Sequence, residues 1–403
     1  VSLTTGTQKN QTYVSVGAVN ARGIIQNNDL DRYNFSVRNT TSMLNDKLTM
    51  DLSFMYSNVK EQNMLSQGEY ANPLVPVYLF PRGDDFSKYQ YYERYDVDRN
   101  IKTQFWPLKE NGLSMQNPYW ITNRNMYTNK KDRFLASGSL KYTITDWLNV
   151  SGRVKLDKET INSEKKMYAS TLNVIAENSD KGAYVQSNKN TSQIYADAML
   201  NINKYFYHDT WNLTASLGAS LLDLDYKELN FGGGLLTIPN LFTSNNANVS
   251  GKLTYKNTNY HDRTNSLFGT FSLGYKGMVY VDGSLRNDWI SALAGTNHSS
   301  ILYPSIGASA ILTNMFTMKS NILSYAKVRL SYSEVGNAPE RFRAITTYAV
   351  LGGLNTTSYF PIKDLKPERT HSWEGGFNLG LFDNKLTLDV TCLLYTSPSP
   401  RDS

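Results

Sequence analysis

The chain is dominated by segments in which apolar and polar residues alternate with a period of two. One such segment runs over 48–56 and another over 211–221. Successive side chains of a strand point to opposite faces, so each segment has one apolar and one polar face. The segments run about 10–12 residues, which exceeds the usual strand length of about 5–6. They match the about 9–11 residues of a tilted strand that crosses a bilayer.

The pattern predicts about 14 strands, joined by connections that alternate between short and long. The predicted strands are 1–8, 12–20, 31–41, 47–58, 132–144, 147–159, 192–203, 210–222, 264–275, 278–287, 303–313, 326–334, 370–381 and 385–391. The long connections are 21–30, 59–131, 160–191, 223–263, 288–302 and 335–369. Outer-membrane barrels collect their long loops at one end, whereas a soluble sandwich has no reason to do so. We therefore expect an all-β fold, part of a large antiparallel transmembrane β-barrel.

Aromatic and charged residues fit the same reading. Aromatics make up 12% of the chain, and Trp147, Trp211 and Phe382 lie beside short turns. Rings in that place form the girdle of a membrane interface, although aromatics also favour strands in general. The polar faces carry charges in mid-strand, among them Asp51 and Arg153. In a barrel such charges must face a lumen that is wet or filled by a polar plug.

Composition excludes several other classes of protein. The net charge is +6 without a run of Lys or Arg, so no nucleic-acid partner is expected. The single cysteine, Cys392, allows neither a disulfide framework nor a cysteine zinc site. The uncharged stretches 229–251, 289–318 and 344–362 are interrupted by Gly, Pro, Asn and Ser, so none predicts an apolar helix of about 20 residues. The opening at Val1 shows no signal peptide, and we interpret the chain as a fragment.

No constellation of residues predicts catalysis, a cofactor or a metal site. The histidines His208, His261, His298 and His371 lack the spacing of metal ligands. Residues 96–107 begin like a calcium loop but place Ile101 where glycine is required. The run 232–234 is expected to be a flexible glycine loop, since no Lys-Ser/Thr follows it to make a phosphate site. We expect no enzyme, no cofactor and no metal.

Several segments, taken in order, resemble one known family. They read VYVDGSLRNDW at 279–289, YPSIGASAILTN at 303–314, KVRLSYSEVGN at 327–337 and DLKPERTHSWEGGFNLGLFDNKLTLDV at 364–390. Near the start, a strand over 12–20 is followed by GII at 23–25 and RYN at 32–34. This ordered set resembles consecutive barrel strands of the SusC/RagA family of TonB-linked outer-membrane transporters. The resemblance extends over nearly the whole chain.

The resemblance implies a 22-stranded barrel of the TonB-dependent receptor type in a Gram-negative outer membrane, surrounded by outer-membrane lipid. It implies an N-terminal plug, a box that contacts the TonB complex and a SusD-like lipoprotein lid. The cargo would be oligosaccharides, or peptides in some members. Residues 1–391 would then be an internal part of the barrel, without plug or TonB box. A passive porin or adhesin barrel is an alternative, and a barrel enzyme would need a convergent Asp/His or Ser/His set that is absent from the sequence.

Residues 392–403 depart from the strand pattern. They read CLLYTSPSPRDS, with two prolines close together. We predict a non-native tail of adapter or vector origin that has no partner strand, so the native sequence beyond about Thr391 is not given. A genuine divergent loop is the alternative.

The connection 59–131 is the predicted place of ligand or partner contact, because it combines length with many aromatic residues. The candidates are Tyr89, Tyr91, Tyr92, Tyr95, Trp106, Tyr119 and Trp120. Flat aromatic faces can stack on sugar rings. Alternatively, the loop packs on itself or on the lid protein, since interfaces also favour Tyr and Trp.

Overall fold

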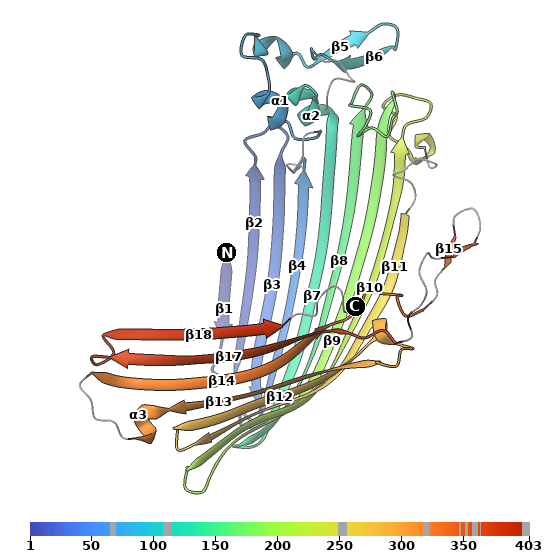
Figure 1. Cartoon of the computed structure of the whole chain (residues 1–403). Coiled ribbons are helices and arrows are strands. Elements are labelled where there is room, and N and C mark those ends of the chain that lie inside the picture. Colours follow the sequence, from blue (N-terminus) through green and yellow to red (C-terminus); the bar gives the residue numbers. More distant parts are fainter. Residues whose placement is uncertain are drawn as a thin grey trace.

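A computed structural model describes most of the chain. The described residues are 1–64, 70–107, 115–248, 256–316, 322–345, 348–350, 354–356, 362 and 364–396. Within them, fourteen strands form one antiparallel sheet in which each strand pairs with the next along the chain (Figure 1). The sheet is open, because β1 and β18 are its two edges. No helix in this part of the chain is long and apolar enough to cross a membrane.

All fourteen predicted strands are confirmed. They are β1 (Ser2–Gly6), β2 (Asn10–Arg22), β3 (Asp29–Met43), β4 (Leu48–Gln62), β7 (Asn125–Thr145), β8 (Leu148–Tyr168), β9 (Gly182–Phe206), β10 (Trp211–Gly234), β11 (Lys256–Tyr275), β12 (Val279–Ile290), β13 (Ser300–Ile311), β14 (Leu323–Asn337), β17 (Glu368–Leu381) and β18 (Leu386–Thr396). Two small hairpins stand apart from the sheet. They are β5 (Glu93–Asp96) with β6 (Ile101–Gln104), and β15 (Tyr348–Val350) with β16 (Leu354–Thr356). The remaining elements are short helices and helical turns: α1 (Leu74–Tyr78), η1 (Phe86–Gln90), α2 (Pro118–Arg124), η2 (Ser244–Asn246), η3 (Ser291–Leu293) and α3 (Leu312–Met315).

The register joins the apolar faces of the strands into one continuous surface. Directly opposed residues of antiparallel strands share a face, and Leu217 of β10 lies opposite Leu200 of β9 and Gly269 of β11. Leu200 in turn lies opposite Val150 of β8. Leu217 is 57% exposed, and the large apolar residues across this face are similarly uncovered. An uncovered apolar surface of this size requires an apolar solvent such as lipid.

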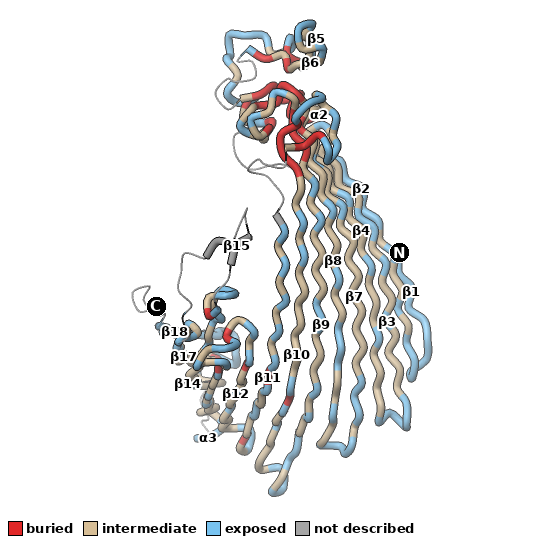
Figure 2. Tube along the Cα trace, turned by 90° about the vertical axis from the view of Figure 1, so that its right-hand side faces the viewer, coloured by how far each residue is buried: buried red, intermediate tan, exposed pale blue. Residues whose placement is uncertain are grey.

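The opposite face of the sheet is polar and carries the mid-strand charges. Arg153 of β8 pairs with Asp197 of β9 at 2.7 Å, and Arg38 of β3 pairs with Asp51 of β4 at 2.8 Å. Figure 2 shows that the sheet is curved, with β12–β18 turned to one side of the longer strands β2–β11. The prediction that the mid-strand charges share one face is therefore confirmed by the register.

Strands β7–β10 are longer than predicted, with 21 to 25 residues each. The apolar face of β7 ends at Phe134, and Asp132 follows it on that face. Beyond this level the same face is polar, since Thr160 donates to Asn190 Oδ1 at 2.9 Å and Arg263 pairs with Asp223 at 2.6 Å. We call this extension, residues 125–132, 158–168, 182–192 and 223–234, the projecting wall. The alternation of apolar and polar residues stops there although backbone pairing continues, so the pattern predicted shorter strands.

Aromatic rings meet on the apolar face at the end with short turns. The ring of Trp211 lies 6.5 Å from that of Phe206, in a stacked arrangement, and 4.7 Å from that of Tyr275. These residues come from three neighbouring strands and are directly opposed in the register. This row is the arrangement expected of an aromatic girdle at a membrane interface.

Two local expectations are wrong. Residues 392–396 do not lack a partner strand, because they continue β18 and pair with residues 371–375 of β17. The rest of the predicted tail, 397–403, lies outside the described residues, and its non-native origin stays a prediction. The triple glycine 232–234 is the end of β10 rather than a flexible loop. A side chain at Gly233 would lie 2.4 Å from the carbonyl oxygen of Asn248, so glycine allows the following connection to close against the strand.

Candidate ligand-binding cap and cavity

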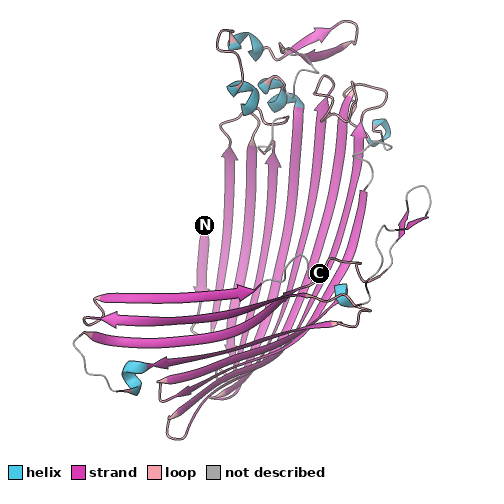
Figure 3. Ribbon diagram, in the orientation of Figure 1, coloured by secondary structure: helices cyan, strands magenta, loops and turns pink. Residues whose placement is uncertain are grey.

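The connection between β4 and β7 folds into a small structured unit at the end of the sheet that carries the long loops (Figure 3). Its described residues, 70–107 and 115–124, contain α1, η1, the β5–β6 hairpin and α2. We call this unit the cap. In Figure 2 it lies at the top of the strands, on the side toward β12–β18. The cap therefore covers the upper end of the polar face.

Helix α2 begins where its sequence favours a helix start. Asn117 is the N-cap residue and accepts a hydrogen bond from the Tyr119 amide at 2.8 Å, while Pro118 occupies the first helical position. Trp120 on this helix is fully buried and donates from Nε1 to Thr171 Oγ1 at 3.0 Å. Since Thr171 belongs to the β8–β9 connection, this bond joins two long loops.

Buried amide side chains hold the cap together. Asn117 Nδ2 donates to the carbonyl oxygens of Tyr89 at 2.8 Å and Phe105 at 2.9 Å. Gln104 Nε2 donates to the Ser170 carbonyl oxygen at 2.5 Å. Buried polar groups stabilise a fold only when they are bonded, and these bonds are specific in geometry. The cap is thus a defined structure rather than an irregular loop.

The structure divides the seven predicted aromatic residues into three groups. Tyr89, Trp106 and Trp120 are buried, Tyr92 and Tyr119 are half-buried, and Tyr91 and Tyr95 are 81% and 61% exposed. The rings of Tyr89 and Trp106 lie 5.3 Å apart, and Phe80 lies within 5.6 Å of both. These rings form the core of the cap. This agrees with the alternative prediction that the connection 59–131 packs on itself. Among the seven, Tyr91 and Tyr95 offer the most open faces for ligand or partner contact.

A charge cluster links the β5–β6 hairpin to α2. Glu93 pairs with Arg124 at 2.6 Å and with Lys102 at 2.7 Å. Burial alone would raise the pKa of Glu93, but the hydrogen bonds from Lys102 and Arg124 outweigh it and hold that pKa below its usual value. The charged form of Glu93 therefore stabilises the folded cap.

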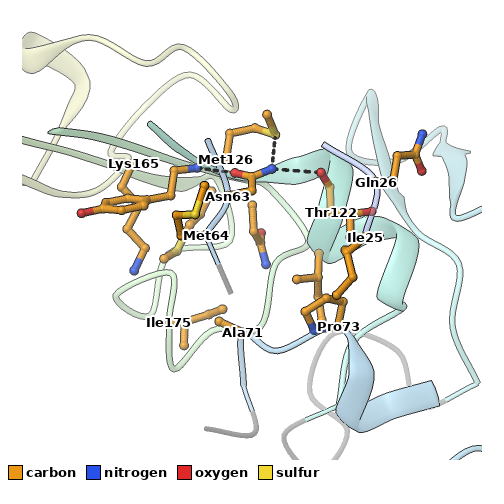
Figure 4. Close-up of a pocket in the computed structure, with 14 residues that line it drawn as sticks. Ile25, Gln26, Asn63, Met64, Ala71, Pro73, Thr122, Met126, Lys165 and Ile175 are labelled. Carbon is orange, nitrogen blue, oxygen red and sulfur yellow. Dashed lines mark hydrogen bonds between the residues drawn. The ribbon is translucent and has the colours of Figure 1, made fainter. Parts of the chain in front are cut away.

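A cavity of about 370 Å³ lies between the cap and the inner side of β7 and β8 (Figure 4). Most of its wall is apolar, from Ile25, Met64, Ile121, Met126, Met167 and Ile175. Asn63 fixes one side, since its Nδ2 donates to the Thr122 carbonyl oxygen at 3.2 Å and to Met126 Sδ at 3.5 Å. No local sequence pattern predicts this cavity, because its lining comes from segments that are distant along the chain.

Lys165 also lines the cavity, and its environment is unusual for a lysine. It belongs to the polar face of β8, nine residues beyond Leu156 and thus outside the apolar band. Among the described residues no carboxylate lies within 4.0 Å of its ammonium group. Burial lowers the pKa of Lys165, and the negative charge of Glu177 opposes this only in part. The neighbouring Lys166, on the other face, pairs with Glu164 at 2.9 Å.

Sequence comparison assigns the chain to a family. Residues 77–391 match the family described as TonB dependent receptor-like, beta-barrel. The chain belongs to this family. The expected TonB-dependent receptor barrel and its location in the outer membrane are thereby confirmed. No protein of curated function matches the chain.

Solved structures share the fold of this receptor barrel. The RagAB peptide transporter has a TM-score of 0.74 at 18% identity, covering 98% of this chain and 43% of that chain. The unliganded ferric citrate transporter FecA has a TM-score of 0.56 at 10% identity, covering 98% and 47%. The ferric-catecholate import receptor Fiu from E. coli K12, in its closed form, has a TM-score of 0.54 at 12% identity, covering 98% and 55%. The predicted resemblance to SusC/RagA-type transporters is confirmed. This chain spans less than half the length of the RagAB chain.

Possible metal ligands were compared across the described part of the chain. Across the residues that the structure describes, no three side chains of His, Cys, Asp or Glu converge on a common point. The candidate site is the cap with its cavity, which offers a largely apolar wall that contains Lys165, and the two exposed tyrosines Tyr91 and Tyr95.

Proposed function

We propose that this chain is part of the barrel of an outer-membrane importer for short peptides. The observation that carries the proposal is the cavity beneath the cap, whose wall contains Met64, Met126 and Met167. Methionine side chains are flexible and polarizable, so such a wall adapts to side chains of different shape. The wall also contains polar side chains, but most of it is apolar, which suits an apolar peptide side chain better than a sugar ring.

The plug, the contact with the TonB complex and the lipoprotein partner are also proposals. The chain spans 43% of the RagAB chain, whose structures are described as a peptide transporter and a peptide importer. By analogy, residues outside this chain would supply the plug and the contact with the TonB complex. A SusD-like lipoprotein would cover the cap from the cell surface, where exposed side chains such as Tyr91 and Tyr95 could meet it.

Oligosaccharide import is the second candidate, and the exposed tyrosines favour it. Tyr91 and Tyr95 project from the cap, and the Tyr95 hydroxyl donates to Asn100 Oδ1. Exposed flat rings beside amide groups can stack on a sugar and bond its hydroxyls. In this reading the seven predicted aromatic residues would act mainly through these two.

Growth experiments separate the two candidates. In a strain that lacks the full-length gene, we expect loss of growth on a peptide mixture as sole nitrogen source, with growth on glycans unchanged. Complementation with Ile25→Trp, which fills the cavity, should restore peptide growth poorly. The adjacent Ile24 is fully exposed, so Ile24→Trp is the matched control and should restore growth completely. Loss of glycan growth alone, sensitive to Tyr91→Ala with Tyr95→Ala, would instead establish the second candidate.

A further inference from the structure

Lys165 places a cation in the largely apolar wall of the cavity. Lys165 has no ion-pair partner within 4.0 Å among the described residues. The cavity that it lines is otherwise formed by three methionines, three isoleucines, Ala71, Pro73 and five uncharged polar side chains. Burying a charge without a partner is costly, and proteins normally pair such groups. The next residue, Lys166, follows the normal pattern through its pair with Glu164. Within the described part of the chain, the ammonium group of Lys165 is therefore open to a ligand.

We propose that Lys165 binds the C-terminal carboxylate of a peptide whose last side chain fills the methionine-lined cavity. This rests on the proposed function in one respect, namely that the cargo is a peptide. A C-terminal residue carries a carboxylate and a side chain on one carbon, so it presents an anion and an apolar group together. The cavity presents their complements, a lysine ammonium and an apolar wall.

The size and the charges around the cavity agree with this occupant. A volume of about 370 Å³ is at the lower end of the range for ligand pockets, about 300–1,000 Å³. It accommodates the end of a peptide rather than a folded partner. Glu177 is too distant to occupy the hydrogen-bonding positions of the ammonium group, so these stay open to a ligand. A carboxylate there would form a charge-assisted hydrogen bond, the stronger kind in proteins.

The position of Lys165 in the sheet fits a role in capture. It lies in the projecting wall, on the polar face beneath the cap, at the level where the cavity meets β7 and β8. Figure 4 shows Lys165 and Ile25 on opposite sides of the cavity. A peptide end between them would contact the projecting wall and the β2–β3 connection at once.

The test uses the purified full-length transporter in detergent and two defined probes. These are the peptide Ala-Ala-Leu with a free carboxylate and the same peptide as a C-terminal amide. Calorimetric titration should show that the wild type binds the free acid about tenfold or more tightly than the amide, as a lost charged hydrogen bond predicts. Lys165→Met should abolish this preference while the protein still binds the amide. Lys165→Arg should keep the preference, and Lys166→Gln, on the opposite face, should leave it unchanged.

Each outcome bears on the proposal. Equal affinity of the wild type for acid and amide, or a preference that persists in Lys165→Met, would overturn it. Absence of binding of both probes would overturn it as well. Heat-modifiable migration of each variant verifies that the barrel is folded. The proposed function fails separately, because its test is growth on peptides, which can succeed even when Lys165 makes no difference.

Discussion

Neighbouring residues of one strand face different solvents in this protein. Leu217 is 57% exposed on the apolar face, while the Ser216 hydroxyl donates to Asn201 Oδ1 at 2.8 Å on the polar face. Because the side chains of a strand alternate, a shift of one residue would exchange the two environments. The register across β9, β10 and β11 excludes such a shift, since it aligns apolar residues throughout.

Arginine substitutions at these two positions should therefore differ in cost. Leu217→Arg places a charge on the lipid face and should reduce the free energy of folding into vesicles by about 2–4 kcal/mol. Ser216→Arg faces the lumen and should cost much less. Urea titration of the intact barrel in lipid vesicles measures both values. Equal losses would show that the assignment of faces is incorrect.

At the scale of elements, the cap depends on a small number of charged contacts. Glu93 joins the β5–β6 hairpin to α2 through Arg124 and is only 16% exposed. Its pKa is lowered in the folded cap, so its contribution to stability is complete above the unfolded value of about 4.3. The contribution is lost as the pH falls through the folded pKa.

We expect the cap to loosen in acid before the barrel does. Hydrogen exchange of residues 93–104, corrected for the intrinsic effect of pH, should be constant from about pH 8 to 5 and accelerate below about pH 4. Glu93→Gln should weaken the cap at neutral pH by about 1–3 kcal/mol and remove this pH dependence. Asp98→Asn changes an exposed acid of the same hairpin and serves as the control. An unchanged pH profile in Glu93→Gln would exclude Glu93 as the cause.

The sequence predicted the strands better than the cap, for physical reasons. Apolar and polar residues alternate wherever a strand separates lipid from water, so the neighbouring residues Leu217 and Ser216 were enough to predict the face that each occupies. In the projecting wall neither face carries the apolar band, and Asp132 or Asn190 therefore gives no periodic signal. In the cap, Trp106 and Trp120 are core residues, but a core built from distant segments leaves no local pattern. Lys165 was predicted only as part of a long connection, because most of the residues that bury it belong to other segments of the chain.

At the scale of the whole molecule, the open edges of the sheet are decisive. Among the residues that the structure describes, the strands β1 and β18 have no neighbours on their outer sides. Unpaired backbone groups cost several kcal/mol each in lipid, so an open sheet is not stable in a bilayer. The described sheet therefore requires further strands to close.

The 403-residue chain expressed alone should consequently fail to form a barrel. After refolding with vesicles, it should show neither the heat-modifiable migration nor the protease resistance of the full-length transporter, which is the control. The physical reason is that the described sheet does not close, so the backbone groups along its two edges lack hydrogen-bond partners. A protease-resistant product from this chain alone would mean that β1 and β18 can pair with each other or with a second copy.

In the proposed importer, the projecting wall also separates binding of the cargo from its passage through the barrel. Lys165 lies nine residues beyond Leu156, which corresponds to about 30 Å along a strand. A molecule held at that height has left bulk water but has not reached the membrane plane. In the proposed importer, residence at the cavity is governed by local contacts alone, while passage through the barrel would need a separate, energised step. Mutations of the wall should change the dwell time of the cargo without altering the speed of the energised step, so the two can be measured independently in one protein.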